Sequence, residues 1–315
     1  MKVALFGGTG FVGGYLVDEL IDQGHTPVVL VRPGSEHKLR HADACLRVGG
    51  AIEDPDAVRR TLEGADAAIY NIGILRAEPR RGVTFESLHL DGAKRAMELA
   101  AATGVSRFLL MSANGVRAEG TAYQKTKFMA EQYLQDTRLQ WTVFRPSVLF
   151  GDPRGNMEFA SQLYRDIVSW PIPAPLFYDG LLPVHAGSLE MSPIHVADVA
   201  HIVVASLERP ETFGRIYPLG GPDRLSWKAI LQTIAAATGK RLFGVPVPIW
   251  MMKAVVGLVE RLPEFPMTRD QLTMLIQGNT CDSREVFVLL GMEPKPFSVE
   301  NLAYLKARRR GPKPG

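Results

Sequence analysis

The fold is decided by the stretch Val3-Ala4-Leu5-Phe6-Gly7-Gly8-Thr9-Gly10-Phe11-Val12-Gly13. Its four leading apolar residues predict a buried strand, and the run from Phe11 to Gln23 has the pattern of a helix that ends at Gly24. The glycines between them allow a tight turn and a close backbone approach, and the free N–H groups at a helix start favour phosphate. The stretch therefore predicts a loop that binds the pyrophosphate of a dinucleotide.

Strand-like and helix-like segments alternate through the first half of the chain. The predicted strands are Lys2–Phe6, Pro27–Val31, Leu46–Val48, Ala67–Asn71, Phe108–Ser112 and Thr142–Arg145, and the predicted helices between them lie near Asp54–Leu62, Phe85–Thr103 and Tyr123–Thr137. This alternation is typical of right-handed βαβ units around a parallel sheet. The sequence thus predicts an α/β protein with a doubly wound parallel sheet.

The sequence changes character after Arg145-Pro146. Four prolines and two glycines predict a long loop, of the kind that often forms a lid or a binding loop: Pro171, Pro173, Pro175, Gly180, Pro183 and Gly187. Helices are predicted near Val196–Leu207, Trp227–Thr238, Ile249–Leu262 and Val299–Arg308. We expect a dinucleotide-binding core over 1–150, a smaller mixed lobe for substrate over 151–305 with elements that return to the core, and a basic, flexible tail over 306–315.

Composition narrows the classes of function. With 315 residues, 46% hydrophobic residues and a net charge of +3, the chain predicts a globular core without a nucleic-acid-binding surface. Cys45 and Cys281 lie far apart and form neither a disulfide framework nor a metal motif. No export signal or membrane span is visible, so we expect a cytoplasmic monomer or homodimer. Ile249–Leu262 or the basic tail could contact a membrane surface or a protein complex.

The residues after the second predicted strand bear on the choice of dinucleotide. An acidic residue there would bind a ribose 2′-hydroxyl, whereas a basic one accommodates a 2′-phosphate. Arg32 occupies the position, Ser35 offers a hydroxyl, and Lys38 lies near enough in sequence to help. NADP(H) is therefore favoured, and NAD(H) stays the alternative.

A second group of residues predicts proton-transfer chemistry. Tyr123 and Lys127 stand four residues apart at the start of a predicted helix, so their side chains lie on one face. A neighbouring ammonium favours the phenolate form of tyrosine, which prepares Tyr123 to exchange a proton with a substrate oxygen. Ser112, at the end of the preceding strand, could orient that oxygen.

Taken together, these motifs resemble the short-chain dehydrogenases/reductases of the extended and atypical branches, which include NAD-dependent epimerases and dehydratases. The resemblance rests on the glycine loop, Asn71-Ile72-Gly73, Gly104–Phe108 with Ser112, Tyr123 with Lys127, Arg145-Pro146-Ser147, Phe150-Gly151 and Pro193–Ala200. It implies a Rossmann fold, a nicotinamide cofactor contacted also by Asn71, Gly73, Pro146 and Lys127, and the catalytic set Ser112, Tyr123 and Lys127. Arg32 and the C-terminal pattern look most similar to the group related to the accessory Rossmann subunit of respiratory complex I.

Three departures from the family pattern leave the activity open. Ala51 replaces an acidic residue that contacts adenine, with Glu53 or Asp54 as possible substitutes; His89 stands where many relatives have asparagine; and the interval from Ser112 to Tyr123 is short. We expect an oxidoreductase or an epimerase/dehydratase acting on a carbonyl or hydroxyl substrate. The alternative is a cofactor-bound structural or assembly protein without turnover.

Overall fold

The computed structural model describes residues 1–259 and 268–307, which fall into two units. Met1–Pro146, Ala197–Leu219 and Arg284–Gly291 form the first unit. The second contains Ser147–Val196, Gly220–Ser283 and the segment from Met292 onward. Two stretches from the second half of the chain thus belong to the first unit by their contacts.

A seven-stranded sheet forms the centre of the first unit. The strands are β1 (Lys2–Phe6), β2 (Thr26–Val31), β3 (Leu46–Gly49), β4 (Ala67–Tyr70), β5 (Arg107–Met111), β6 (Gln140–Pro146) and β11 (Arg215–Leu219). Their order is β11-β6-β5-β4-β1-β2-β3, and every neighbouring pair is parallel. The predicted doubly wound Rossmann fold is therefore confirmed, with β11 as an additional edge strand that the local pattern did not predict.

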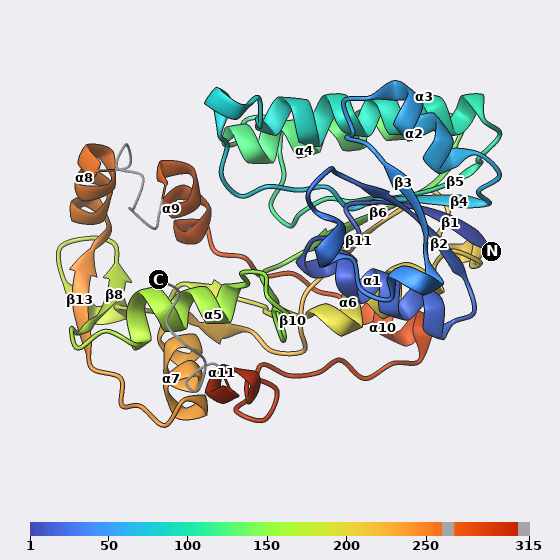
Figure 1. The fold of residues 1–315 in the computed structure, drawn as a ribbon. Coiled ribbons are helices and arrows are strands. Elements are labelled where there is room, and N and C mark those ends of the chain that lie inside the picture. Colours follow the sequence, from blue (N-terminus) through green and yellow to red (C-terminus); the bar gives the residue numbers. More distant parts are fainter. Residues whose placement is uncertain (260–267, 308–315) are drawn as a thin grey trace. The chain divides into compact units, whose positions relative to one another are not determined.

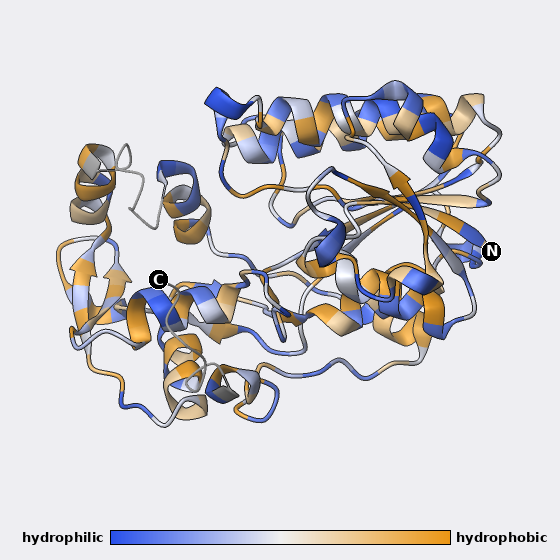
Figure 2. Ribbon diagram, in the orientation of Figure 1, coloured by the Kyte–Doolittle hydropathy of each residue, from blue (hydrophilic) through white to orange (hydrophobic). Residues whose placement is uncertain are grey.

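Helices cover both faces of this sheet. In Figure 1, α2 (Pro55–Leu62), α3 (Gly92–Ala102) and α4 (Ala122–Gln135) lie on one face, while α1 (Phe11–Asp22), α6 (Val196–Ala205) and α10 (Arg284–Leu290) lie on the other. Hydrophobic colours are frequent on the central strands, whereas the covering helices alternate hydrophobic and hydrophilic residues (Figure 2). Small residues on α3 allow close packing against alternate strand residues, and the shared core includes Ala4, Phe6, Ala68, Tyr70, Ala93, Ala96, Ala100, Phe108 and Leu110.

Local sequence signals fix where two of these helices begin. The Asp54 carboxylate accepts the backbone N–H groups of Asp56 and Ala57 at the start of α2. Thr121 and Gln124 form a capping box at the start of α4, with reciprocal side-chain to backbone hydrogen bonds. The short turns η1 (Glu36–Lys38), η2 (Ala42–Ala44), η3 (Pro79–Arg81) and η7 (Pro210–Thr212) and the π-helical η4 (Glu86–Asp91) complete the unit.

The second unit is built from short paired strands and helices. Its elements are β7 (Leu149–Phe150), α5 (Phe159–Leu163), η5 (Tyr164–Val168), β8 (Ala174–Tyr178), η6 (Pro183–His185), β9 (Glu190–Met191), β10 (Ile194–His195), β12 (Leu225–Ser226), α7 (Trp227–Ala237), β13 (Gly244–Pro248), α8 (Ile249–Val259), α9 (Arg269–Ile276) and α11 (Tyr304–Ala307). β7 pairs with β10, β9 with β12, and β8 with β13. Trp227 is buried in the core of this unit and donates its indole N–H to the carbonyl of Pro175 at 2.8 Å.

Two predictions for this unit are wrong in part. The predicted loop over 171–187 contains β8 and η6. Pro175 is tolerated in β8 because the two-stranded sheet leaves one edge of this strand unpaired. The terminal helix spans Tyr304–Ala307 among the described residues, after turns over 299–303. Residues 260–262 of the predicted apolar helix and 308–315 of the basic tail lie outside the described residues. In the part of the chain that the structure describes, no helix combines the length and hydrophobicity needed to cross a membrane.

Candidate cofactor and active site

The glycine loop between β1 and α1 has the close backbone packing that its sequence predicts. Gly7 has φ +93°, a left-handed conformation that favours glycine. A Cβ atom on Gly13 would lie 2.0 Å from the Gly7 carbonyl oxygen, so no larger residue fits there without moving the loop. Gly10 caps α1 without a side-chain bond, and the N–H groups of Phe11, Val12 and Gly13 in the first turn have no acceptor within the helix. The loop thus offers backbone donors to an anion.

The carboxyl end of β4 lies against this loop. The Asn71 N–H donates to the Phe6 carbonyl at 2.9 Å, and a Cβ on Gly7 would be 3.0 Å from the Asn71 carbonyl carbon and oxygen. Two residues further on, a Cβ on Gly73 would be 3.6 Å from the Lys127 ammonium nitrogen. Gly7, Asn71, Gly73 and Lys127 therefore border one region at the carboxyl edge of the sheet.

The residues after β2 present positive charge to solvent. Arg32 is exposed, and its guanidinium has no hydrogen-bond or ion-pair partner among the residues described here. The Ser35 N–H donates to the Arg32 carbonyl at 2.9 Å and closes the turn that holds both residues. Arg40 was not singled out from the sequence, yet its Cδ lies 3.6 Å from where a Cβ on Gly14 would be, and its Nε is 3.4 Å from the Asp18 carboxylate. A second arginine thus lies beside α1, the helix that follows the glycine loop.

Lys127 is held at the end of β5 by the start of α4. Its ammonium donates to the Met111 carbonyl at 3.0 Å and lies 5.9 Å from the centre of the Tyr123 ring. The side chain is only 7% exposed, and burial lowers the pKa of Lys127 to about 8, although the Glu131 carboxylate acts in the opposite direction. This ammonium is therefore ready to lose its proton in the mildly alkaline range.

Burial has a larger effect on the pKa of Tyr123 than the neighbouring Lys127 ammonium. Burial raises the pKa of the Tyr123 phenol, and it outweighs the influence of the lysine, whose nitrogen is bonded to a backbone carbonyl instead. Near neutral pH the phenol therefore keeps its proton. A protonated phenol can donate a proton but cannot accept one as a base.

Ser112 carries the unsatisfied polar atom of this region. It is 4% exposed, and its hydroxyl oxygen has no hydrogen-bond partner among the described residues. Ser112, Lys127, His89 and Tyr70 line the same narrow internal gap. A buried hydroxyl without a partner is costly in a folded protein, so this group is available to a polar atom of a bound molecule. Together with the backbone donors of the glycine loop, this hydroxyl is a polar group that a bound dinucleotide could use.

His89 lies in η4 and contacts the same tyrosine. Its Nε2 accepts the Ile74 N–H at 3.0 Å, and its Nδ1 is 3.4 Å from the Thr126 hydroxyl. The ring centre is 5.2 Å from that of Tyr123 and 5.4 Å from that of Phe85. Phe85 and Thr126 were missed by sequence reasoning, because aromatic and threonine residues on predicted helices give no functional signal by themselves. Their contacts with His89 appear only when η4 and α4 pack together.

The remaining predicted residues lie as follows. Pro146 ends β6, and its carbonyl accepts the Asn114 N–H at 2.8 Å. Asp54, one possible substitute for an adenine-contacting acid, is the N-cap of α2, and Glu53 beside it is exposed. No group of three His, Cys, Asp or Glu residues that could hold a metal occurs within 1–259 and 268–307.

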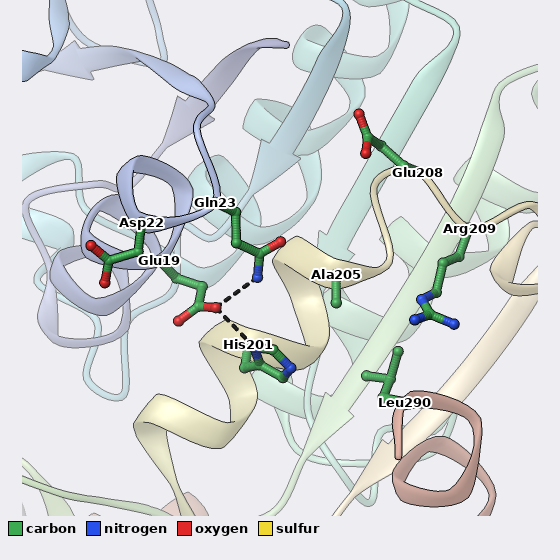
Figure 3. Close-up of a pocket in the computed structure, with 8 residues that line it drawn as sticks. All are labelled: Glu19, Asp22, Gln23, His201, Ala205, Glu208, Arg209 and Leu290. Atoms are coloured by element: carbon green, nitrogen blue, oxygen red, sulfur yellow. Dashed lines mark hydrogen bonds and ion pairs between the residues drawn. The ribbon is translucent and has the colours of Figure 1, made fainter. Parts of the chain in front are cut away.

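A separate open pocket of about 720 Å³ lies in the first unit (Figure 3). It is lined by Glu19, Asp22, Gln23, His201, Ala205, Glu208, Arg209 and Leu290. His201 Nδ1 is 2.8 Å from the Glu19 carboxylate. The pocket lies at the C-terminal end of α1, whereas the glycine loop lies at its N-terminal end, about 18 Å away for a helix of this length. Its acidic lining is unsuited to the phosphates of a dinucleotide.

Comparison with known proteins agrees with this geometry. The chain matches the model of the NAD(P)H-binding family over residues 7–166, and it belongs to that family, among the extended short-chain dehydrogenase/reductase and epimerase-like proteins. It is 25% identical over 314 residues to the mitochondrial NADH-ubiquinone oxidoreductase 40 kDa subunit of Neurospora crassa, covering 97% of this chain and 79% of that protein. It is 30% identical over 250 residues to the ceramide reductase of Caulobacter vibrioides, covering 78% and 74%.

A solved structure supports the same fold. The UDP-glucose 4-epimerase of Thermus thermophilus in complex with NAD superposes with a TM-score of 0.71 at 19% identity, covering 99% of both chains. At this identity the likeness establishes the fold alone. The chain is therefore an NAD(P)-binding protein with a Rossmann fold, similar in sequence to a ceramide reductase and to a mitochondrial NADH-ubiquinone oxidoreductase subunit.

Proposed function

We propose that this protein is an NADP(H)-dependent reductase of a carbonyl substrate, with Tyr123 as the proton donor. The observation that carries the proposal is the cluster at the end of β5: a protonated phenol, a buried ammonium and a hydroxyl without a partner. Its relation to a ceramide reductase supports reduction over epimerisation or dehydration. The relative's substrate also makes carbonyl groups on long-chain lipids the first compounds to examine.

Each residue of the cluster has a distinct task in this proposal. The nicotinamide ring supplies a hydride to the carbonyl carbon when the cofactor is bound. Ser112 donates a hydrogen bond to the carbonyl oxygen, which places that oxygen beside Tyr123. Tyr123 gives its proton to the same oxygen, so the carbonyl becomes an alcohol. Lys127 stabilises the phenolate that Tyr123 leaves behind, and solvent returns the proton.

Arg32 is proposed to select the 2′-phosphate of NADP(H). Its exposed guanidinium, without a partner among the described residues, supports this role, and we propose that Ser35 and Arg40 assist it. Arg32→Asp should weaken NADPH binding about 10- to 100-fold, since a hydrogen bond to a charged group contributes about 1.5–3 kcal/mol. NADH binding should change little. Equal losses for both dinucleotides would remove Arg32 as the selector.

The test of the reaction is the oxidation of NADPH in the presence of carbonyl compounds, including long-chain ketones. Tyr123→Phe should lower kcat about 100- to 10,000-fold, the range of a general acid. Its affinity for NADPH, followed by cofactor fluorescence, should stay close to that of the unmodified protein. Tyr133→Phe is the matched control, since this tyrosine lies on the same helix and bonds to Glu98. Undiminished turnover in Tyr123→Phe would refute the proposed role.

A second candidate function is a cofactor-bound assembly protein without turnover. Two observations favour it: the relation to a 40 kDa complex I subunit and the exposure of apolar residues on α8, where Trp250 is 68% and Leu258 82% exposed. Such a surface suits a protein or membrane contact. In that case NADPH should raise the melting temperature while no carbonyl compound oxidises it. Trp250→Ser should then impair assembly in cells and leave cofactor binding unchanged.

A further inference from the structure

We propose that His89 is a positioning residue for Tyr123: a neutral imidazole with a single fixed tautomer that joins the first turn of α4 to the segment after β4. The inference rests on the proposed function only in that Tyr123 is taken as the proton donor. His89 touches neither cofactor nor substrate in this proposal, and it acts through the phenol and through Ile74.

The hydrogen bonds of His89 assign its tautomer. A backbone N–H can only donate, so the Nε2 atom that receives the Ile74 N–H at 3.0 Å must be unprotonated. The proton of a neutral ring is then on Nδ1, which faces the Thr126 hydroxyl at 3.4 Å. That hydroxyl donates onward to the Ala122 carbonyl at 2.9 Å and is free to accept from Nδ1. Nε2 is thus only an acceptor and Nδ1 only a donor.

The surroundings of His89 keep it uncharged. The Lys127 ammonium on α4 faces it across the gap, and the other titratable groups around it are the phenols of Tyr123 and Tyr70. Among the residues that the structure describes, no carboxylate lines this gap to offset a second positive charge. Burial and the lysine together lower the pKa of His89 to about 2. Protonation would also break the bond from Ile74, since an imidazolium has no acceptor.

The aromatic contacts explain how this residue places the phenol. The rings of Phe85 and His89 stand edge to face with Tyr123, at 5.8 Å and 5.2 Å between centres and nearly perpendicular. Such contacts restrict the swing of the Tyr123 ring about its first side-chain torsion. The π-helical turn of η4 brings both rings to α4, and π-helical turns occur often at functional sites.

The bond to Ile74 extends this control to the cofactor side. Ile74 directly follows Gly73, whose Cα faces the Lys127 ammonium. His89 therefore fixes, with one ring, both the phenol and the segment that borders the cofactor region. Displacements of reacting groups by about 1 Å can cost about 100-fold in rate, so a loss of this residue should be visible in kcat.

The first test is independent of activity. In protein labelled with ¹⁵N-histidine, the His89 signals should show an unprotonated Nε2 and a protonated Nδ1, unchanged between about pH 5 and 8. His89→Gln removes these signals and assigns them. His185 on η6 is the solvent-exposed control in the same spectra. Titration of His89, or a proton on its Nε2, would overturn the proposal.

The second test uses substitutions that separate the contacts. His89→Phe keeps the ring packing but loses both hydrogen bonds, and we expect kcat to fall about 10- to 100-fold, with an unchanged acid limb of the pH profile and little change in NADPH affinity. His89→Gln retains an acceptor for the Ile74 N–H and should recover part of the loss. Wild-type kcat in His89→Phe would overturn the proposal, as would a shifted acid limb.

A third measurement keeps this outcome distinct from failure of the proposed reaction. If no carbonyl compound is reduced, the ring signals of Tyr123 in ¹³C-tyrosine-labelled protein, assigned through Tyr123→Phe, report the position of the phenol directly. These signals should shift and broaden in His89→Phe and not in His185→Phe. Unchanged Tyr123 signals would overturn the positioning role, whatever the activity.

Discussion

Replacing Lys127 with methionine should make the protein more stable near neutral pH. The ammonium is buried, and the pKa of Lys127 is about 8 in the folded chain against an ordinary value of 10.5, a difference worth about 3 kcal/mol. The folded state holds this proton less tightly than the unfolded chain, so the charge lowers the free energy of unfolding. This penalty has its full value below pH 8. The penalty disappears as the pH rises toward 10.5. Methionine has similar length and carries no charge.

The expected gain in stability is reduced by the loss of one hydrogen bond. The Met111 carbonyl accepts from Lys127 at 3.0 Å, and removing that donor costs about 1 kcal/mol. Lys127→Met should therefore gain about 2 kcal/mol in the free energy of unfolding at pH 7. By pH 9.5 the charge penalty falls by about 2 kcal/mol, so the two proteins should be about equally stable.

Urea unfolding of both proteins at several pH values measures this difference. Other titrating groups are common to the two chains and cancel in the comparison. Lys125→Met is the matched control, since Lys125 is exposed on the same helix and its removal should change stability by less than about 0.5 kcal/mol at any pH. A gain that does not depend on pH, or a less stable variant at pH 7, would show that the ammonium is not penalised by burial.

Three further outcomes are expected. Gly13→Ala should weaken binding of both NADPH and NADH, because its Cβ would lie 2.0 Å from the Gly7 carbonyl oxygen. Calorimetric titration would measure this, with Gly49→Ala as a control whose Cβ meets nothing within 4 Å. Arg107→Met should lower the free energy of unfolding by about 3–5 kcal/mol. Its buried guanidinium donates to the carbonyls of Gln140 and Ser206 and to the hydroxyls of Thr142 and Thr212. Urea unfolding measures the loss, and Arg117→Met, at an exposed arginine, should change it little. Glu131→Gln should lower the pKa of Lys127 further, because the Glu131 carboxylate favours the ammonium. In that background, the stability difference that Lys127→Met produces should disappear at a lower pH.

Short-range patterns were enough to predict the nucleotide-binding half. The glycine loop after Phe6 and the alternation of apolar strands with helices follow from residues close together in the chain, and the sheet confirms them. β11 was missed because Arg215–Leu219 has no hydrophobic alternation of its own and forms a strand by pairing with β6, some 70 residues earlier in the sequence. The roles of Ser112, Tyr123 and Lys127 in catalysis stay predictions.

The sequence by itself determined which chemical groups are present and that the Tyr123 and Lys127 side chains share a helix face. The tertiary structure decided their protonation, since the pKa values of Tyr123, Lys127 and His89 depend on burial by elements distant in the chain. It also decided that the Ser112 hydroxyl has no partner among the described residues and that His89 bonds to Ile74 and faces Thr126. The physical reason is that spacing along a helix is local, whereas desolvation and hydrogen-bond pairing are set by whatever packs around a group in three dimensions.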